Sequence, residues 1–265
     1  MTAANSAARC AAADQLVAAD ASGRLRSFRV LAASGAVSTN VDASKVQVFG
    51  EVAEILDARR LELHKADGDP SAARAAFVDR QGSYLIGREA FEQLWVDGDQ
   101  FVYGALNAGG LGTQGRYGPF CLVIGRPTER GRPVALFPGD SAQRYNVAAG
   151  LDSDSARSEA TAWDDRDSLA VVERHAEALA NYEAEWPAVI CRPGSYLEAV
   201  MGPPLPIEDV VEVRLPRPYL DRLAELQTGE LDGEVLSRSE REEVLAFTEL
   251  QNWRAVRGTD VIGIP

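Results

Sequence analysis

The chain has 265 residues, of which 46% are apolar and 25% are charged, so it can bury a substantial core in one large domain or two small ones. Its 40 acidic residues outnumber its 27 basic residues and give a formal net charge of −13. This balance argues against a surface built mainly to bind nucleic acid or anionic lipid, although it allows a small basic pocket for a phosphate-bearing ligand.

The residue types that most often bind metals are few and widely spaced. Cys10, Cys121 and Cys191 have no CxxC spacing, which favours buried thiols in a reducing compartment over a zinc site or a disulfide framework. Neither His64 nor His175 has a second ligand at a suitable spacing. We therefore predict no metal site, and only a site built entirely from carboxylates stays open.

No membrane-spanning or secretory segment is recognisable in the sequence. Its apolar runs stay well short of the ~18 residues that a membrane-spanning helix needs. The alanine-rich first twenty residues lack the basic start and the apolar centre of a secretory signal. We expect a cytoplasmic protein that does not enter membranes, while an unconventional or injection-type export route would leave no pattern to read.

The first eighty residues are predicted to be mostly helical. Residues 4–20 favour a marginal helix and residues 24–33 a short amphipathic one. The clearest helical period follows Asp42, a good N-cap, with apolar residues at three- and four-residue steps up to Leu56. Asp69-Pro70 is typical of the start of a further helix. We treat residues 1–80 as a helical N-terminal region that can contact a protein partner.

The remaining residues, 81–265, are predicted to form an α+β domain. Helical or mixed structure is expected at residues 84–95, and helices at about 168–186, 218–226 and 239–253. Strands are expected at residues 101–103, 120–124, 134–137, 188–191, 196–201 and 210–215. Because only short connections separate most of these strands, a mixed or antiparallel sheet with flanking helices is favoured over a doubly wound parallel sheet.

A glycine-rich stretch, residues 101–126, leads into the most apolar predicted strand. Its loop contains Gly109, Gly110, Gly112, Gly115 and Gly118. Glycines permit positive φ and let a ligand approach the backbone amides, which can bind phosphate. The stretch is neither a Walker sequence nor a dinucleotide fingerprint, because no Gly-Lys-Ser/Thr follows and the loop leads into a strand. A surface loop or wide hairpin is the alternative.

Two further patterns follow this loop. Five arginines lie within thirty residues, namely Arg116, Arg126, Arg130, Arg132 and Arg144. Guanidinium groups suit phosphate, although these residues can equally balance nearby acid on a solvated loop. Asp140-Ser141 follows a predicted strand and a Pro-Gly turn. A serine there can bind a ligand sugar or position a catalytic group, or it can close an ordinary Asx or Ser turn.

Glu198 is the one carboxylate in an otherwise apolar strand-like run, residues 196–201. Strand alternation places it on the same face as Tyr196 and Val200. A carboxylate on such a strand needs a partner, a site or an exposed edge, because burying an unpaired charge is costly. Glu198 is therefore either a functional group or an edge-strand acid in a salt bridge.

Three segments resemble the ADP-ribosyltransferase-like domains of bacterial toxins and effectors. They are RYGPFCLVI at residues 116–124, VALFPGDS at residues 134–141 and YLEAVMGPPLPIEDVVEV at residues 196–213. The resemblance covers roughly residues 100–215. It implies a split, strongly bent sheet with NAD in a cleft, and a late-strand glutamate that orients the nicotinamide ribose and favours an oxocarbenium-like transition state. Glu198 matches that glutamate.

The resemblance also implies roles for other residues. Ser141 would support the ribose, and Tyr103 or Tyr117 would stack on the nicotinamide. The cofactor phosphates would be held by Gly109, Gly110, Gly112 and Arg116.

The sequence departs from the family pattern at several positions. Tyr103-Gly104 stands where the family usually has arginine or histidine, so Arg116 is the substitute candidate. Only Ser141 represents the family's Ser-Thr-Ser triplet. Tyr196 stands two residues before Glu198, where glutamate or glutamine often accompanies arginine or cysteine acceptors, so an arginine acceptor is not expected.

Two other functions stay open. The first is a non-enzymatic interaction protein that binds a partner through residues 1–80 and the acidic segment 152–167. The second is a binder of a nucleotide or phosphate ligand without transfer chemistry. Neither the acceptor nor the oligomeric state is encoded in a pattern that we can recognise.

Overall fold

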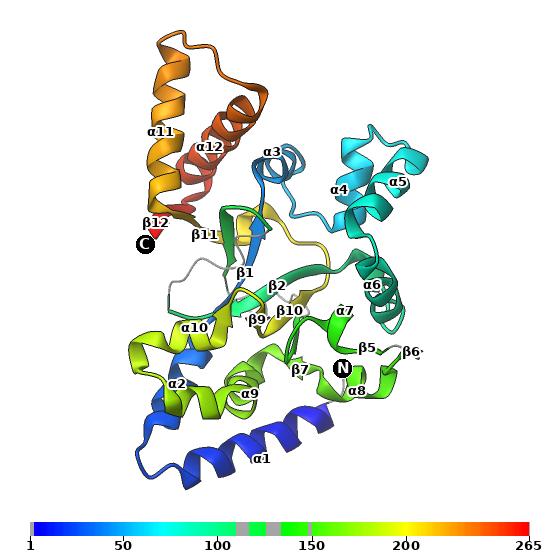
Figure 1. The fold of residues 1–265 in the computed structure, drawn as a ribbon, viewed down its shortest axis with the longest axis vertical. Coiled ribbons are helices and arrows are strands. Elements are labelled where there is room, and N and C mark those ends of the chain that lie inside the picture. The colour runs from blue at the N-terminus through cyan, green and yellow to red at the C-terminus, as the bar shows by residue number, and fades with distance from the viewer. Residues whose placement is uncertain (1–2, 110–116, 126–133, 148–149, 265) are drawn as a thin grey trace.

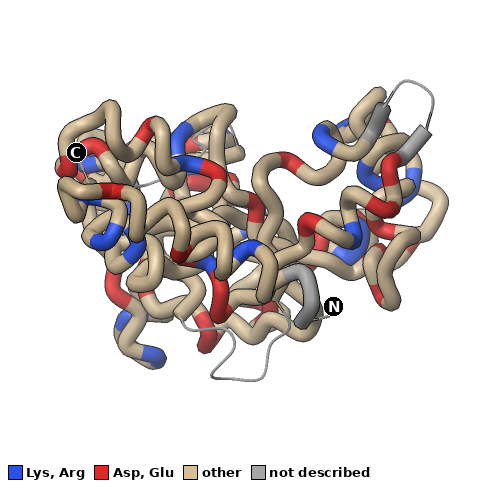
Figure 2. The backbone as a smooth tube through the Cα atoms, turned by 90° about the horizontal axis from the view of Figure 1, so that it is seen from below, with Lys and Arg blue, Asp and Glu red and all other residues tan. Residues whose placement is uncertain are grey.

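The computed structural model describes residues 3–109, 117–125, 134–147 and 150–264. Helices flank a central sheet of mixed strand directions (Figure 1), which confirms the predicted α+β fold class. Acidic and basic residues are interspersed along the chain, and neither sign is confined to one side of the molecule (Figure 2). Within the described part of the chain, no helix is both long enough and apolar enough to span a membrane.

Eight strands form one hydrogen-bonded sheet in the order β12-β11-β3-β1-β2-β10-β4-β7. Their bounds are β1 (Ala36–Val41), β2 (Val102–Asn107), β3 (Phe120–Ile124), β4 (Val134–Phe137), β7 (Thr161–Ala162), β10 (Glu198–Met201), β11 (Val210–Pro216) and β12 (Asp260–Ile264). Neighbours are antiparallel, except that β11 and β12 are parallel. Two small antiparallel pairs are β5 (Asn146–Val147) with β6 (Gly150–Leu151), and β8 (Cys191–Arg192) with β9 (Ser195–Tyr196).

Strand β1 occupies the centre of this sheet, although the sequence analysis predicts no strand in the first third of the chain. Ser38 pairs with Ala105 of β2 on one side and with Val123 of β3 on the other. β1 thereby joins the two groups of strands into one sheet, where the resemblance implies a split one. Its sequence gives little strand signal because Ser38, Thr39 and Asn40 line a cavity instead of packing into the core.

The helices largely follow the predicted order. Their bounds are α1 (Ala3–Ala19), α2 (Arg24–Ala33), α3 (Ala43–Val52), α4 (Ala58–Lys65), α5 (Pro70–Gln81), α6 (Tyr84–Glu92), α7 (Ser141–Arg144), α8 (Ser153–Glu159), α9 (Arg166–Ala180), α10 (Trp186–Ile190), α11 (Arg217–Leu231) and α12 (Arg238–Arg257). Asp42 caps α3 by accepting a hydrogen bond from the Lys45 backbone N–H at 3.0 Å, as predicted. Asp69 likewise caps α5, which begins at Pro70.

The strand predicted at residues 188–191 is wrong, because most of this segment belongs to helix α10. A run of four apolar residues does not distinguish a buried strand from a buried helix. Pro187 stands in the first turn of α10, where proline is well tolerated. The Trp186 indole N–H donates a hydrogen bond to the Ala178 carbonyl oxygen of α9 at 2.8 Å, which holds α10 against that helix.

Two hydrophobic clusters fix these elements in place. The larger one lies between the sheet and the helices α1, α2, α3, α9, α10, α11 and α12, and it buries Phe28, Phe120 and Trp253. The smaller one joins α6 to β4 and β10, with the rings of Phe91 and Phe137 5.2 Å apart. The smaller cluster therefore sets the position of α6 over the part of the sheet that carries Glu198.

Candidate functional site

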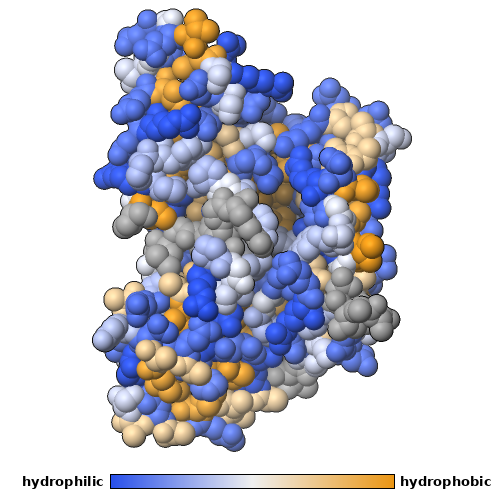
Figure 3. All heavy atoms as spheres, in the orientation of Figure 1, coloured by the Kyte–Doolittle hydropathy of each residue, from blue (hydrophilic) through white to orange (hydrophobic). Residues whose placement is uncertain are grey.

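A cavity of about 630 Å³ opens on one face of the sheet. Its walls come from β1, β2 and β10 and from helices α3 to α6, with one residue from α7 and one from β9. The molecular surface is hollowed between α3 and α4, where apolar atoms are visible at the bottom of the hollow (Figure 3). The volume lies within the range of small-molecule and cofactor sites in proteins.

Glu198 lies on the wall of this cavity, at the start of strand β10. β10 is an interior strand between β2 and β4, so Glu198 is not an edge-strand acid. Its side chain is buried, and Oε2 accepts a hydrogen bond from the backbone N–H of Ser141 at 2.9 Å. Burial, together with repulsion from Asp140, raises the pKa of Glu198 to about 8, while hydrogen bonding from Ser141 opposes the increase.

The turn after β4 explains why Ser141 meets Glu198. β4 runs antiparallel to β10 with Phe137 opposite Glu198, and α7 begins four residues later. Asp140 caps α7 by accepting a hydrogen bond from the Gln143 N–H at 3.1 Å, which directs the first turn of the helix toward β10. Two predicted catalytic residues that lie 57 positions apart in the sequence are thus in direct contact.

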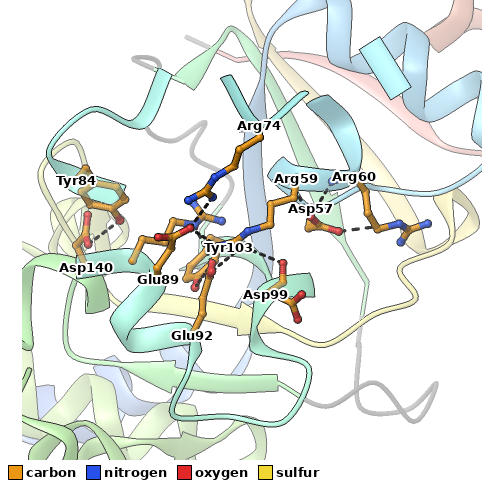
Figure 4. Close-up of polar contacts among 11 residues, drawn as sticks. Asp57, Arg59, Arg60, Arg74, Tyr84, Glu89, Glu92, Asp99, Tyr103 and Asp140 are labelled. Atoms are coloured by element: carbon orange, nitrogen blue, oxygen red, sulfur yellow. Dashed lines mark hydrogen bonds and ion pairs between the residues drawn. The ribbon is translucent and has the colours of Figure 1, made fainter. Parts of the chain in front are cut away.

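Two buried polar atoms beside Glu198 make no hydrogen bond of good geometry with the described residues. They are Ser141 Oγ and Asp140 Oδ2. The other Asp140 oxygen accepts a hydrogen bond from the Tyr84 hydroxyl at 2.9 Å (Figure 4). Buried polar atoms without partners are rare in proteins, so these two atoms mark a polar cluster behind the wall of the cavity that Glu198 forms.

Aromatic side chains surround the same end of the cavity. Tyr103, Tyr117 and Tyr196 all line it. The Arg88 guanidinium lies 4.2 Å from the centre of the Tyr103 ring and covers one face of it. Tyr117, by contrast, is 43% exposed. Of the two tyrosines predicted to stack on a ligand, Tyr117 therefore has the more accessible ring.

A polar network on α6, which was not predicted from the sequence, supports this end of the cavity. Glu92 accepts hydrogen bonds from Arg88 Nε at 2.9 Å and from the Tyr103 hydroxyl at 3.2 Å, and it pairs with Arg59 at 2.6 Å (Figure 4). Tyr84, Arg88 and Glu92 are spaced by four residues and form one stripe along the helix. That spacing was the available signal, because a polar stripe that faces a sheet indicates a buried network or a site.

The remaining predicted site residues are not gathered at the cavity. Gly109 follows β2 with a φ of 76°, and a Cβ there would lie 2.4 Å from Pro187 Cγ of α10. Arg144 pairs with Glu159 at 2.7 Å, which agrees with the charge-balancing alternative. Gly110, Gly112 and Arg116 lie outside the described residues, as do Gly115, Arg126, Arg130 and Arg132.

Across the described ranges, no three histidine, cysteine, aspartate or glutamate side chains are grouped to hold a metal ion. Comparison with protein-family models gave no match, and comparisons with curated proteins and with solved structures gave no significant match. A functional assignment therefore rests on the side chains around Glu198 and on the three segments that resemble ADP-ribosyltransferases.

Proposed function

We propose that this chain is an ADP-ribosyltransferase-like enzyme that uses NAD to modify an acceptor, with Glu198 as its catalytic carboxylate. The observation that carries the proposal is the place of Glu198, buried on an interior strand, exposed to a cavity and held by the Ser141 backbone N–H. An acidic side chain is rarely kept at such a position for stability, because burial disfavours its charged form.

The residues around Glu198 fit the nicotinamide ribose of NAD. Tyr117 lines the cavity and offers an aromatic face for the nicotinamide ring, while Ser141 and Asp140 lie behind Glu198 rather than line the cavity, and the Ser141 N–H supports the Glu198 carboxylate. NAD, when bound, supplies a ribosyl group whose bond to nicotinamide breaks with the electron pair on nicotinamide, while C1′ bonds the acceptor atom and the acceptor's proton leaves. The ionised Glu198 carboxylate accepts a hydrogen bond from the ribose and stabilises the positive charge that develops on it.

The high pKa of Glu198 has a consequence for this role. With a pKa of about 8, Glu198 is mostly protonated in the free protein at neutral pH. A cationic ligand beside the carboxyl favours its ionised form, so binding of the ligand and loss of the proton are coupled. We expect NAD turnover to increase as the pH rises toward 8.

The test is NAD turnover, followed as released nicotinamide, with and without protein acceptors. Glu198→Gln keeps the shape of the side chain and an oxygen for the Ser141 N–H, so NAD should still bind. The variant should lose about 10²–10³ in turnover, the usual effect of removing one group that stabilises transition-state charge. Glu225→Gln, on the exposed side of α11, is the matched control and should keep full activity. Equal turnover by Glu198→Gln, or no binding and no turnover by the wild type, would end the proposal.

A nucleotide binder without transfer chemistry is the second candidate function. It is favoured by Lys45 and Arg80, two cationic side chains that line the same cavity. This alternative predicts a rise in melting temperature on adding nucleotide, with the same rise in Glu198→Gln and no turnover in either protein.

A further inference from the structure

The cavity extends from Glu198 into a part built by the first third of the chain. More than half of its lining residues come from residues 38–81, on β1, α3, α4 and α5 and in the connections between them. We call this part the α3–α5 compartment and define it by Lys45, Phe49, Asp57, Leu61 and Arg80. The resemblance to ADP-ribosyltransferases covers none of these residues, so it gives no account of them.

Two cations, Lys45 and Arg80, line the α3–α5 compartment, together with the carboxylates of Asp42 and Asp57. Lys45 contacts Asp42 at 3.3 Å and Arg80 contacts Glu62 at 2.5 Å, yet each cation keeps donor N–H groups beyond that one contact. Lys65 lies nearby and donates a hydrogen bond to Ser44 Oγ at 2.9 Å. Burial lowers the pKa of Lys65, while the charge of Asp42 opposes this decrease more strongly than the charges of Arg80 and Lys45 add to it individually. The remaining donors of Lys45 and Arg80 can bind an anion in the compartment.

A buried carboxylate oxygen on the same wall lacks a hydrogen-bond donor. Asp57 is 3% exposed, and its Oδ1 caps α4 by accepting the N–H groups of Arg59 and Arg60. Its Oδ2 makes no hydrogen bond to any described residue and is 4.0 Å from Arg60 Nε (Figure 4). A buried acceptor of this kind requires a donor, and a ligand hydroxyl can supply one.

The rest of the compartment is apolar. Phe49, Ile55, Leu56 and Leu61 line it, and all four are buried. They offer a surface on which a flat heterocycle can pack. The compartment therefore combines an apolar wall, an acceptor for a hydroxyl group and two cations.

We infer that the α3–α5 compartment binds a nucleoside diphosphate, with its phosphates at Lys45 and Arg80, a ribose hydroxyl at Asp57 and its base against Phe49 and Leu61. This inference rests on the proposed function in one respect, since it identifies the nucleotide as the adenosine diphosphate half of NAD. The first third of the chain then supplies half of the substrate site.

The test measures ADP binding by titration calorimetry at low salt, with no turnover involved. Lys45→Gln should weaken ADP binding by about tenfold or more, since hydrogen bonds to charged groups contribute about 1.5–3 kcal/mol. Arg238→Gln, whose side chain is 95% exposed on α12, is the matched control and should bind ADP like the wild type. Adenosine, which lacks the phosphates, should bind equally to the wild type and Lys45→Gln.

A variant can fold poorly for reasons unrelated to ADP, since Arg80→Gln, for example, would leave the buried Glu62 without its partner. A second measurement therefore uses the wild type alone. In the wild type, ADP should slow hydrogen exchange of the backbone amides in residues 43–61. The inference is overturned if ADP does not bind. It is also overturned if Lys45→Gln binds ADP like the wild type and ADP slows hydrogen exchange only outside residues 43–61.

The outcomes also separate this inference from the proposed function. If Glu198→Gln abolishes NAD turnover but Lys45→Gln binds ADP as tightly as the wild type, the transferase proposal is supported and the compartment assignment fails. If ADP binding depends on Lys45 and Glu198→Gln binds ADP normally, but the wild type never turns NAD over, the compartment is a nucleotide site and the transferase proposal fails.

Discussion

Replacing Glu198 by glutamine should stabilise the free protein, and the gain should grow as the pH rises. The native state holds the Glu198 proton up to a pH of about 8, whereas the unfolded chain releases it near the ordinary glutamate pKa of 4.5. Between these values the native state binds more protons than the unfolded state, so the free energy of unfolding falls as the pH increases. Glutamine does not ionise, and it therefore removes this loss.

The size of the effect follows from the two pKa values. Each pH unit between them costs the wild type up to about 1.4 kcal/mol, so the part due to Glu198 falls by roughly 2 kcal/mol between pH 5 and pH 7. The Glu198 carboxylate at the cavity thus lowers the free energy of unfolding at neutral pH, and such a loss of stability is common at functional sites.

The assay is urea denaturation at pH 5, 6, 7 and 8, followed by the fluorescence of the four tryptophans. The free energy of unfolding of Glu198→Gln minus that of the wild type should increase steadily with pH. Glu225→Gln keeps Glu198 and removes one exposed carboxylate instead. The difference in unfolding free energy between this variant and the wild type should therefore stay flat with pH. A flat difference for Glu198→Gln as well would refute the reasoning, because Glu198 would then ionise alike in the folded and unfolded states.

Three further results are expected. At NAD concentrations well below KM, where rates report the free protein, NAD turnover by the wild type should increase with pH up to about 8, and the residual turnover of Glu198→Gln should not. Gly104→Ala should destabilise the protein by about 1–3 kcal/mol in urea, because the added Cβ would lie 2.6 Å from the Ser38 carbonyl oxygen, while Gly139→Ala has open space and should be neutral. Glu92→Gln should cost about 3 kcal/mol, since it leaves Arg59 and Arg88 without their shared partner, and a smaller loss than Glu89→Gln would contradict this.

The sequence predicted the parts of the fold that have their own local signal. Helix α3 after Asp42 and strand β3 were predicted because capping and apolar runs are local patterns. Glu198 stood out because a lone carboxylate in an apolar strand needs a compensating environment. The resemblance assigned Glu198 and Ser141 to one site, and in the structure the Ser141 backbone N–H donates a hydrogen bond to the Glu198 carboxylate.

Other parts were hidden because their signal arises only from tertiary structure. Strand β1 is polar at Ser38, Thr39 and Asn40, so its two core valines, Val37 and Val41, are too few to give a recognisable alternating pattern. Arg88 shares a four-residue spacing with Glu92, but only the tertiary structure places its guanidinium against the Tyr103 ring of the sheet. The cavity residues of the first third depend on pairing between β1 and β2, whose partners are about 70 positions apart.

The position of β1 leads to a last prediction, which concerns residues 1–80 as a whole. A chain beginning at residue 81 should not fold, because it loses the strand that hydrogen-bonds to both β2 and β3. Without β1, the backbone N–H and C=O groups on the facing edges of those two strands lose their partners, and the Lys45 and Asp57 walls of the cavity disappear. The fragment should show low protection from proteolysis and no ADP binding. A fragment of residues 81–265 that resists proteolysis would show the first third to be a separate unit. An interaction role for residues 1–80 is therefore tested by substitutions on the exposed surfaces of α1 and α5, which leave β1 in place.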